Sequence, residues 1–176
     1  IKTLELNVKN DKVETVKVNM GTPILLPKDV PVVSDKDKVV DEPIVIDDKE
    51  YRITCVSMGN PHAITFIENT DDLEIETIGP KFENNPIFPD RVNTEFIQVL
   101  DRNTVKMRVW ERGSGETFAC GTGACATVVA CVLNGLTDDK VTVKLLGGDL
   151  FIEYNREENT VYMTGPKVSF TGKIEV

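Results

Sequence analysis

Cys120 is the residue best placed to do chemistry in this sequence. It follows a strand-like approach over residues 115–119 and precedes Gly121-Thr122-Gly123, after which a small, apolar, uncharged segment runs to Asn134-Gly135. This order predicts a cysteine at the first turn of a buried helix. Free N–H groups and the helix dipole favour a thiolate there. We therefore expect a lowered pKa for Cys120, and a base or nucleophile near neutral pH.

Gly121, Thr122 and Gly123 also predict an anion site. Glycines let a ligand approach the backbone closely, and the first N–H groups of a helix have no partner within the helix, so this corner suits a carboxylate or a phosphate. Two hypotheses stay open from the residues alone. Cys120 is either a reactive thiol beside this anion site, or a small buried hydrophobe where glycines permit tight packing.

The other three cysteines are expected to be core residues. Cys125 and Cys131 lie within the apolar helical segment, and Cys55 alternates within a strand-like stretch. We expect no metal site, because the Cys120/Cys125/Cys131 spacing matches no structural zinc site and a single histidine adds little. A chain of this length can build a core without disulfides, which favours a reducing cytoplasm.

Polar residues of two further segments are candidates for the same site. His62, the only histidine, follows an Asn-Pro turn, where side chains face solvent or ligand, although a lone histidine is more often structural. Glu111 and Arg112 end a strand that leads into the cysteine corner, so they are suited to an ammonium and a carboxylate, or form an exposed ion pair. A hydrolase built on Cys120 and His62 is a third hypothesis, and it requires a hydrogen-bonded thiol–imidazole pair.

Most of the remaining sequence predicts strands around one buried helix. Residues 71–84 predict a short helix with Thr70 or Asp71 as its N-cap, and residues 20–31 break the pattern as a linker or domain boundary. Asn134-Gly135 is expected to be the C-cap of the buried helix. Alternating hydrophobicity predicts a hairpin over 4–18 and strands over 39–46, 51–56, 63–67, 92–100, 105–110, 141–146, 150–154 and 161–164.

Length and charge exclude several classes of function. The chain has 176 residues, which predicts one domain or a domain plus a fragment, and its opening inside a strand-like segment at Ile1 indicates truncation. It carries 20 Lys and Arg against 29 Asp and Glu, a net charge of −9, without a basic stripe. Nucleic acid and anionic membranes are therefore not expected as partners. No apolar run approaches the roughly 18 residues needed to span a bilayer.

Four motifs together resemble the diaminopimelate epimerase family, the pyridoxal-independent amino-acid epimerases of bacterial lysine and cell-wall synthesis. They occur in the family's order, and Met163-Thr164-Gly165-Pro166 follows as the last motif, as in its members. The motifs are Met58-Gly59-Asn60-Pro61-His62-Ala63, Val92-Asn93-Thr94-Glu95-Phe96, Glu111-Arg112-Gly113-Ser114-Gly115-Glu116-Thr117 and Ala119-Cys120-Gly121-Thr122-Gly123-Ala124-Cys125-Ala126.

The resemblance implies an α+β fold in which a β-barrel-like sheet wraps a central buried helix, with the active site between two similar halves. Only one such domain is present here, with a remnant of its pseudo-symmetric partner. Residues 1–21 are expected to be the final strands of the N-terminal half, residues 22–165 the C-terminal domain, and residues 166–176 a tail that returns to the missing half.

The resemblance also implies the roles of individual residues. Family members use two cysteines on opposite faces of the substrate's α-carbon, and Cys120 would be one of them. His62 and Glu111 would tune its environment. The groups expected to hold the substrate are the N–H groups of Gly121 and Thr122 and the side chains of Asn60, Asn93, Glu111 and Arg112.

The expected activity is interconversion of LL- and meso-diaminopimelate without any cofactor, in the cytoplasm, with a small-molecule substrate as the partner. The resemblance leaves a homodimer open for the full-length enzyme. None of Cys55, Cys125 and Cys131 stands in the motif of the second catalytic cysteine, so we expect this chain alone to be inactive. The alternative function is a non-catalytic domain that binds an anion or amino acid at the helix N-terminus.

Overall fold

A single curved sheet surrounds one central helix in the computed structural model, which describes residues 3–166. The sheet follows the order β1-β2-β11-β10-β9-β7-β6-β5-β4-β3, with β8 paired to β7. The strands are β1 (Leu4–Lys9), β2 (Lys12–Gly21), β3 (Glu42–Ile46), β4 (Lys49–Ser57), β5 (Pro61–Phe66), β6 (Asn93–Asp101), β7 (Thr104–Glu111), β8 (Gly115–Glu116), β9 (Lys140–Leu145), β10 (Gly148–Asn155) and β11 (Thr160–Pro166).

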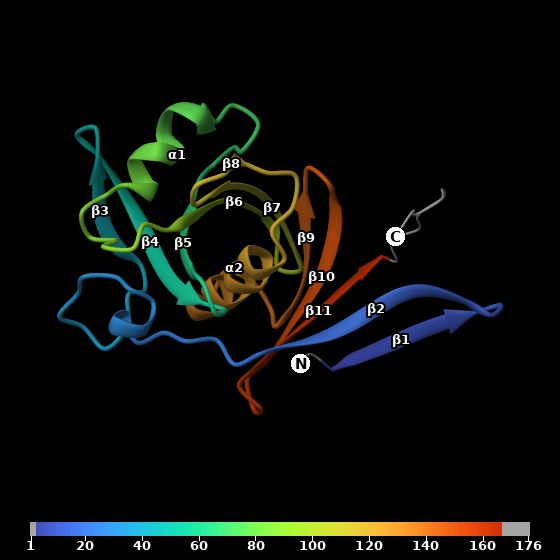
Figure 1. The fold of residues 1–176 in the computed structure, drawn as a ribbon. Helices are drawn as coiled ribbons and strands as arrows, with labels where there is room; N and C mark the ends of the chain where they lie inside the picture. The colour runs from blue at the N-terminus through green and yellow to red at the C-terminus, as the bar shows by residue number, and fades with distance from the viewer. Residues whose placement is uncertain (1–2, 167–176) are drawn as a thin grey trace, which may run out of the picture.

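The central helix, α2 (Gly121–Leu133), is buried because it is apolar on every side. Figure 1 shows the sheet curving around it. Inward-facing residues of the sheet, such as Ile97 and Ile152, pack against α2 in one hydrophobic cluster. Asn134 caps the C-terminal end of the helix: its backbone N–H and its side-chain amide both donate to the carbonyl of Ala130. Gly135 follows with φ +68°. The expected C-cap is therefore confirmed.

A second hydrophobic cluster lies on the outer side of the sheet, beneath α1 (Ile75–Glu83). Phe82 of α1 packs edge-on against Phe96 of β6, with ring centroids 5.4 Å apart. Residues on successive positions of β6 therefore face the two clusters in turn: Phe96 faces α1, whereas Ile97 faces α2. The strand pairs β5/β6 and β7/β9 are parallel, and the other pairs are antiparallel.

The expected fold is confirmed, with two corrections to where elements begin. The outer helix begins at Ile75, because Thr70 donates its N–H and its hydroxyl to Gln98 and does not cap a helix. The strand expected from residue 39 begins at Glu42. Residues 20–31, expected to be a linker or domain boundary, contain local structure: β2 runs to Gly21, the backbones of Ile24 and Ser57 hydrogen-bond to each other, and a 3-10 turn, η1 (Pro27–Asp29), follows.

The division of the chain into residues 1–21, 22–165 and 166–176 stays a prediction. The hairpin of β1 and β2 continues the sheet through β11 and projects away from the helix-filled body (Figure 1). The expected tail lies, after Pro166, outside the described residues.

Candidate active site

Cys120 stands at the N-cap of α2, as the sequence predicts. Its backbone is extended, with φ −135° and ψ 104°, and its sulfur accepts a hydrogen bond from the Gly123 N–H at 3.4 Å. The Thr122 hydroxyl lies 3.6 Å from the same sulfur. Among the described residues the N–H groups of Gly121 and Thr122 have no hydrogen-bond partner, as expected for the first turn of a helix. The sulfur and two unpartnered donors therefore share this corner.

The expected lowering of the Cys120 pKa is wrong for this chain. Only 6% of the residue is exposed, and burial raises its pKa to about 12, with the nearby Glu95 carboxylate as the second cause and Glu111 as a smaller one. The hydrogen bonds from Thr122 and Gly123 oppose this rise without cancelling it. Desolvation of the thiolate outweighs the helix N-terminus here. Cys120 is a thiol at rest.

His62 and Glu95 form a fully buried pair beside that thiol. The imidazole Nδ1 lies 2.6 Å from Glu95 Oε1, and neither side chain is exposed to solvent. The other ring nitrogen, Nε2, lies 3.1 Å from Asn60 Oδ1. Ligand-type atoms of His62, Glu95 and Cys120 lie within 4.8 Å of one another. Because both ring nitrogens are already occupied by Asn60 and Glu95, we assign no metal to this cluster.

The hydrogen bonds of His62 also decide against the hydrolase hypothesis. A Cys–His hydrolase needs an imidazole nitrogen bonded to the thiol. Here the two nitrogens contact Glu95 and Asn60, and the Cys120 sulfur contacts Gly123 and Thr122. The thiol and the imidazole are neighbours without being a hydrogen-bonded pair.

Asn93 connects the loops that carry the other candidate residues. Its side-chain amide donates to the Pro61 carbonyl at 3.0 Å and accepts from the Arg112 backbone N–H at 2.8 Å. The guanidinium of Arg112 donates to the Asp90 carbonyl at 2.8 Å, and the Glu111 carboxylate accepts from the Thr117 hydroxyl. Asn93 is buried, so in this arrangement its amide holds the start of β5 and the end of β7 together.

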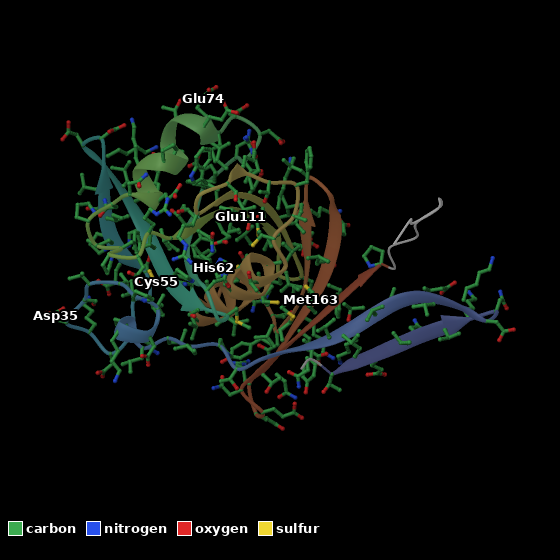
Figure 2. All side chains as sticks on the ribbon, in the orientation of Figure 1. Asp35, Cys55, His62, Glu74, Glu111 and Met163 are labelled. Carbon is green, nitrogen blue, oxygen red and sulfur yellow. The ribbon has the colours of Figure 1, made fainter. Side chains whose placement is uncertain are left out.

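Figure 2 shows how the wrapped sheet gathers these side chains around α2: His62 comes from β5, Glu111 from β7 and Met163 from β11. Gly121 lies close to the end of the Met163 side chain, because a Cβ at that glycine would lie 3.1 Å from the methionine sulfur. The structure thus brings Cys120, His62, Asn60, Glu111, Gly121 and Thr122 to one end of the helix.

The family of the chain follows from comparisons with known proteins. The family model described as diaminopimelate epimerase matches residues 54–170, which include every candidate residue named above. The chain belongs to the diaminopimelate epimerase family. It is 59% identical over its whole length to a diaminopimelate epimerase of Acetivibrio thermocellus, and 56% identical to one of Methanococcus maripaludis. It spans 63% and 64% of the length of these two relatives.

Solved structures support the same fold. A hydroxyproline epimerase from Agrobacterium vitis superposes with a TM-score of 0.66 at 13% identity, covering 96% of this chain and 58% of that protein. A probable proline racemase from Agrobacterium radiobacter superposes with a TM-score of 0.67 at 10% identity, covering 99% and 61%. Among the described residues, no helix is long and apolar enough to cross a membrane.

The core role expected for the remaining cysteines is confirmed. Cys55, Cys125 and Cys131 are buried, and burial raises the pKa of Cys131 to about 12. Burial also raises the pKa of Cys55, and Glu95 adds to that rise.

Sequence reasoning missed Glu95 as a member of the site, although it lies within one of the family motifs. The available signal was its position in β6: it shares a face with Ile97 and Val99, both of which pack toward α2. A carboxylate on such a face must have a buried partner.

Proposed function

We propose that this chain is the C-terminal part of a diaminopimelate epimerase, with Cys120 as one of two catalytic cysteines. The observation that carries the proposal is the position of Cys120 at the start of a buried helix, beside two unpartnered N–H groups and the His62–Glu95 pair. The 59% identity to a relative named diaminopimelate epimerase supports the substrate. The reaction would need no cofactor.

The chemistry requires a group on each face of the α-carbon. A cysteine thiolate on one face removes the α-proton: the C–H bond breaks, an S–H bond forms, and the electron pair moves into the substrate carboxylate. The N–H groups of Gly121 and Thr122 would hold that carboxylate and stabilise the developing charge. A second cysteine on the opposite face then gives its proton to the carbon. Inversion follows from delivery to the other face.

Cys120 can serve as either member of such a pair. Because Cys120 rests as a thiol, it would donate its proton to the α-carbon in one direction of the reaction. In the reverse direction its thiolate would remove the α-proton, which restores the thiol. Asn60, Glu111 and Arg112 would bind the amino and carboxylate groups of the substrate. The planar guanidinium of Arg112 is suited to a distal carboxylate, which would distinguish diaminopimelate from shorter amino acids. Asn93 would act at this site too, through its remaining amide hydrogen.

The second cysteine must come from outside this chain. Cys55 and Cys131 are buried core residues with raised pKa values, and Cys125 lies inside α2. We therefore propose that the chain alone is inactive, and that the complete enzyme, which we place in the cytoplasm, acts on its small-molecule substrate as a monomer or homodimer.

Proton exchange tests the proposal directly. In an enzyme that joins this chain to an N-terminal half, incubation with LL-diaminopimelate in deuterium oxide should give meso product carrying deuterium at the inverted carbon. Cys120→Ala should abolish this incorporation, whereas Cys131→Ala should retain it, because Cys131 lies in the core of the same helix. The 176-residue chain alone should show none. Full exchange by the Cys120→Ala enzyme would refute the proposal.

The alternative function, a non-catalytic anion-binding domain, is favoured only by the unpartnered N–H groups of Gly121 and Thr122. It predicts that carboxylates protect Cys120 from alkylation while no deuterium is ever incorporated, even by the enzyme with both halves.

A further inference from the structure

Glu95 is a buried carboxylate that the mechanism above does not use. Its residue exposure is 0%, one oxygen contacts His62, and the other oxygen, Oε2, has no hydrogen-bond partner among the described residues. Its carboxylate also packs against the first turn of α2, because a Cβ at Gly123 would lie only 2.5 Å from Glu95 Oε1. A buried charge needs compensation, and His62 is the one basic group within ion-pair distance of Glu95 in residues 3–166.

The contacts of His62 indicate how the charge is compensated. One ring nitrogen faces a carboxylate oxygen of Glu95 and the other faces the amide oxygen of Asn60. With Glu95 ionised, both ring nitrogens face acceptor oxygens, which is the arrangement that suits a ring carrying a proton on each nitrogen. The 2.6 Å separation of Nδ1 and Oε1 is in the range of charge-assisted hydrogen bonds. An imidazolium paired with a carboxylate fits both contacts of the ring.

We propose that Glu95 is a positioning residue of the active site: it holds His62 as an imidazolium, whose second N–H donates to Asn60 Oδ1 and so turns the Asn60 amide hydrogens toward the substrate. This inference rests on the proposed function for its catalytic consequence. Glu95 itself touches neither substrate nor the reacting atoms. Its positioning effect passes through His62 to Asn60, and its charge also raises the pKa of Cys120.

The groups around the pair come from four elements. Cys55 of β4 and Cys120 at the N-cap of α2 both experience the negative charge of Glu95, and Glu111 of β7 acts on Cys120. Asn60 precedes β5 and supplies the neutral acceptor. The thiols are uncharged at neutral pH, so within this group the charge of Glu95 is balanced by His62 alone.

A single histidine makes the proposal testable without any enzyme assay. Since His62 is the only histidine in the chain, its ring nitrogens give the only imidazole signals in a 15N NMR spectrum of the untagged protein. Both nitrogens should show the protonated signature at about pH 7. In Glu95→Gln the ring should become neutral at the same pH, and Glu95→Asp should restore at least part of the protonated signal. Glu68→Gln, an exposed change close to the end of β5, is the matched control.

The catalytic consequence is measured separately in the complete enzyme. Glu95→Gln should lower kcat/KM by about tenfold or more, with a rise in KM, because the Asn60 amide loses its fixed orientation. A neutral His62 in the wild-type protein, or an unchanged ring in Glu95→Gln, would overturn the inference. Loss of all epimerase activity by the wild-type enzyme, with the NMR result intact, would overturn the proposed function instead.

Discussion

At the scale of single residues, the site depends on two glycines that differ in what they face. Gly123 lies between the Glu95 carboxylate and the Cys120 sulfur: a Cβ there would be 2.5 Å from Glu95 Oε1 and 3.1 Å from the sulfur. Gly121 faces the flexible end of Met163, 3.1 Å from its sulfur. Glycine 123 is therefore required by a rigid, buried pair, whereas glycine 121 is limited only by a side chain that can move.

Replacing each glycine by alanine should therefore change the free energy of unfolding by different amounts. Alanine normally stabilises a helix by about 0.5–1 kcal/mol relative to glycine. Gly121→Ala should keep the free energy of unfolding within about 1 kcal/mol of the wild type. Gly123→Ala should lower it by about 1–3 kcal/mol, because the buried His62–Glu95 pair must shift. Urea denaturation measures both, and equal stability of the two variants would contradict the assignment.

At the scale of secondary-structure elements, the loop that carries Glu111 and Arg112 is held from α1 by Glu83. This buried carboxylate accepts from the Arg91 guanidinium at 2.9 Å, from the Gly113 N–H at 2.9 Å and from Trp110 Nε1 at 2.7 Å. Gly113 has φ +79°, a conformation suited to glycine. Glu83 thus joins α1, the end of β7 and the turn that follows it.

Removal of Glu83 should destabilise the protein and loosen that turn. Glu83→Ala leaves the donors of Gly113 and Trp110 without an acceptor, and we expect a loss of about 2–4 kcal/mol in the free energy of unfolding. Glu76→Ala, on the exposed side of the same helix, should change it by less than about 0.5 kcal/mol. Tryptophan fluorescence during urea unfolding reports both, since Trp110 is the only tryptophan. If Glu83→Ala lowered the free energy of unfolding no more than Glu76→Ala does, Glu83 would not be what holds this turn.

Local patterns predict the elements well and their long-range partners poorly. The helix after Cys120 follows from its uniformly apolar residues and from Asn134-Gly135, all of which are neighbours in sequence. The start of α1 does not follow from neighbouring residues, because the hydroxyl of Thr70, an expected N-cap, donates to Gln98, 28 residues away. The His62–Glu95 pair needs the parallel register of β5 and β6, which no local pattern contains. The lowered pKa expected for Cys120 is wrong for the same reason: the burial of its thiol and its carboxylate neighbours, Glu95 and Glu111, come from distant strands.

At the scale of the whole molecule, the hairpin of β1 and β2 projects beyond the body of the protein (Figure 1), and one of its faces is apolar. Three of its six cross-strand pairs are apolar and lie on this face: Leu4/Val18, Leu6/Val16 and Val8/Val13. Val18 is in turn paired with Met163, whose sulfur lies beside the start of α2. Paired residues share one face of a sheet, so the hairpin extends the face that packs on α2.

Along the hairpin itself, that face is open. Leu4, Leu6 and Val8 are each more than half exposed. An apolar face of this kind normally buries itself against another element, and each such side chain contributes about 1.5–3 kcal/mol when fully buried. The N-terminal half that we propose for the complete enzyme is the natural cover. In the 176-residue chain, a second copy of the same face is the available substitute.

This face should therefore drive self-association of the isolated chain. Sedimentation velocity over a range of concentrations should show dimers or larger species for the wild-type chain, and Leu6→Lys should shift it toward monomer because a charge enters the apolar row. Asn7→Lys makes the same addition of charge on the opposite face of β1, and should leave association unchanged. If the wild-type chain stays monomeric, or if both lysine variants behave alike, the hairpin face is not a docking surface. If Leu6→Lys removes self-association and Asn7→Lys does not, the interface lies on the apolar face of the hairpin, which continues the face of the sheet that packs on α2.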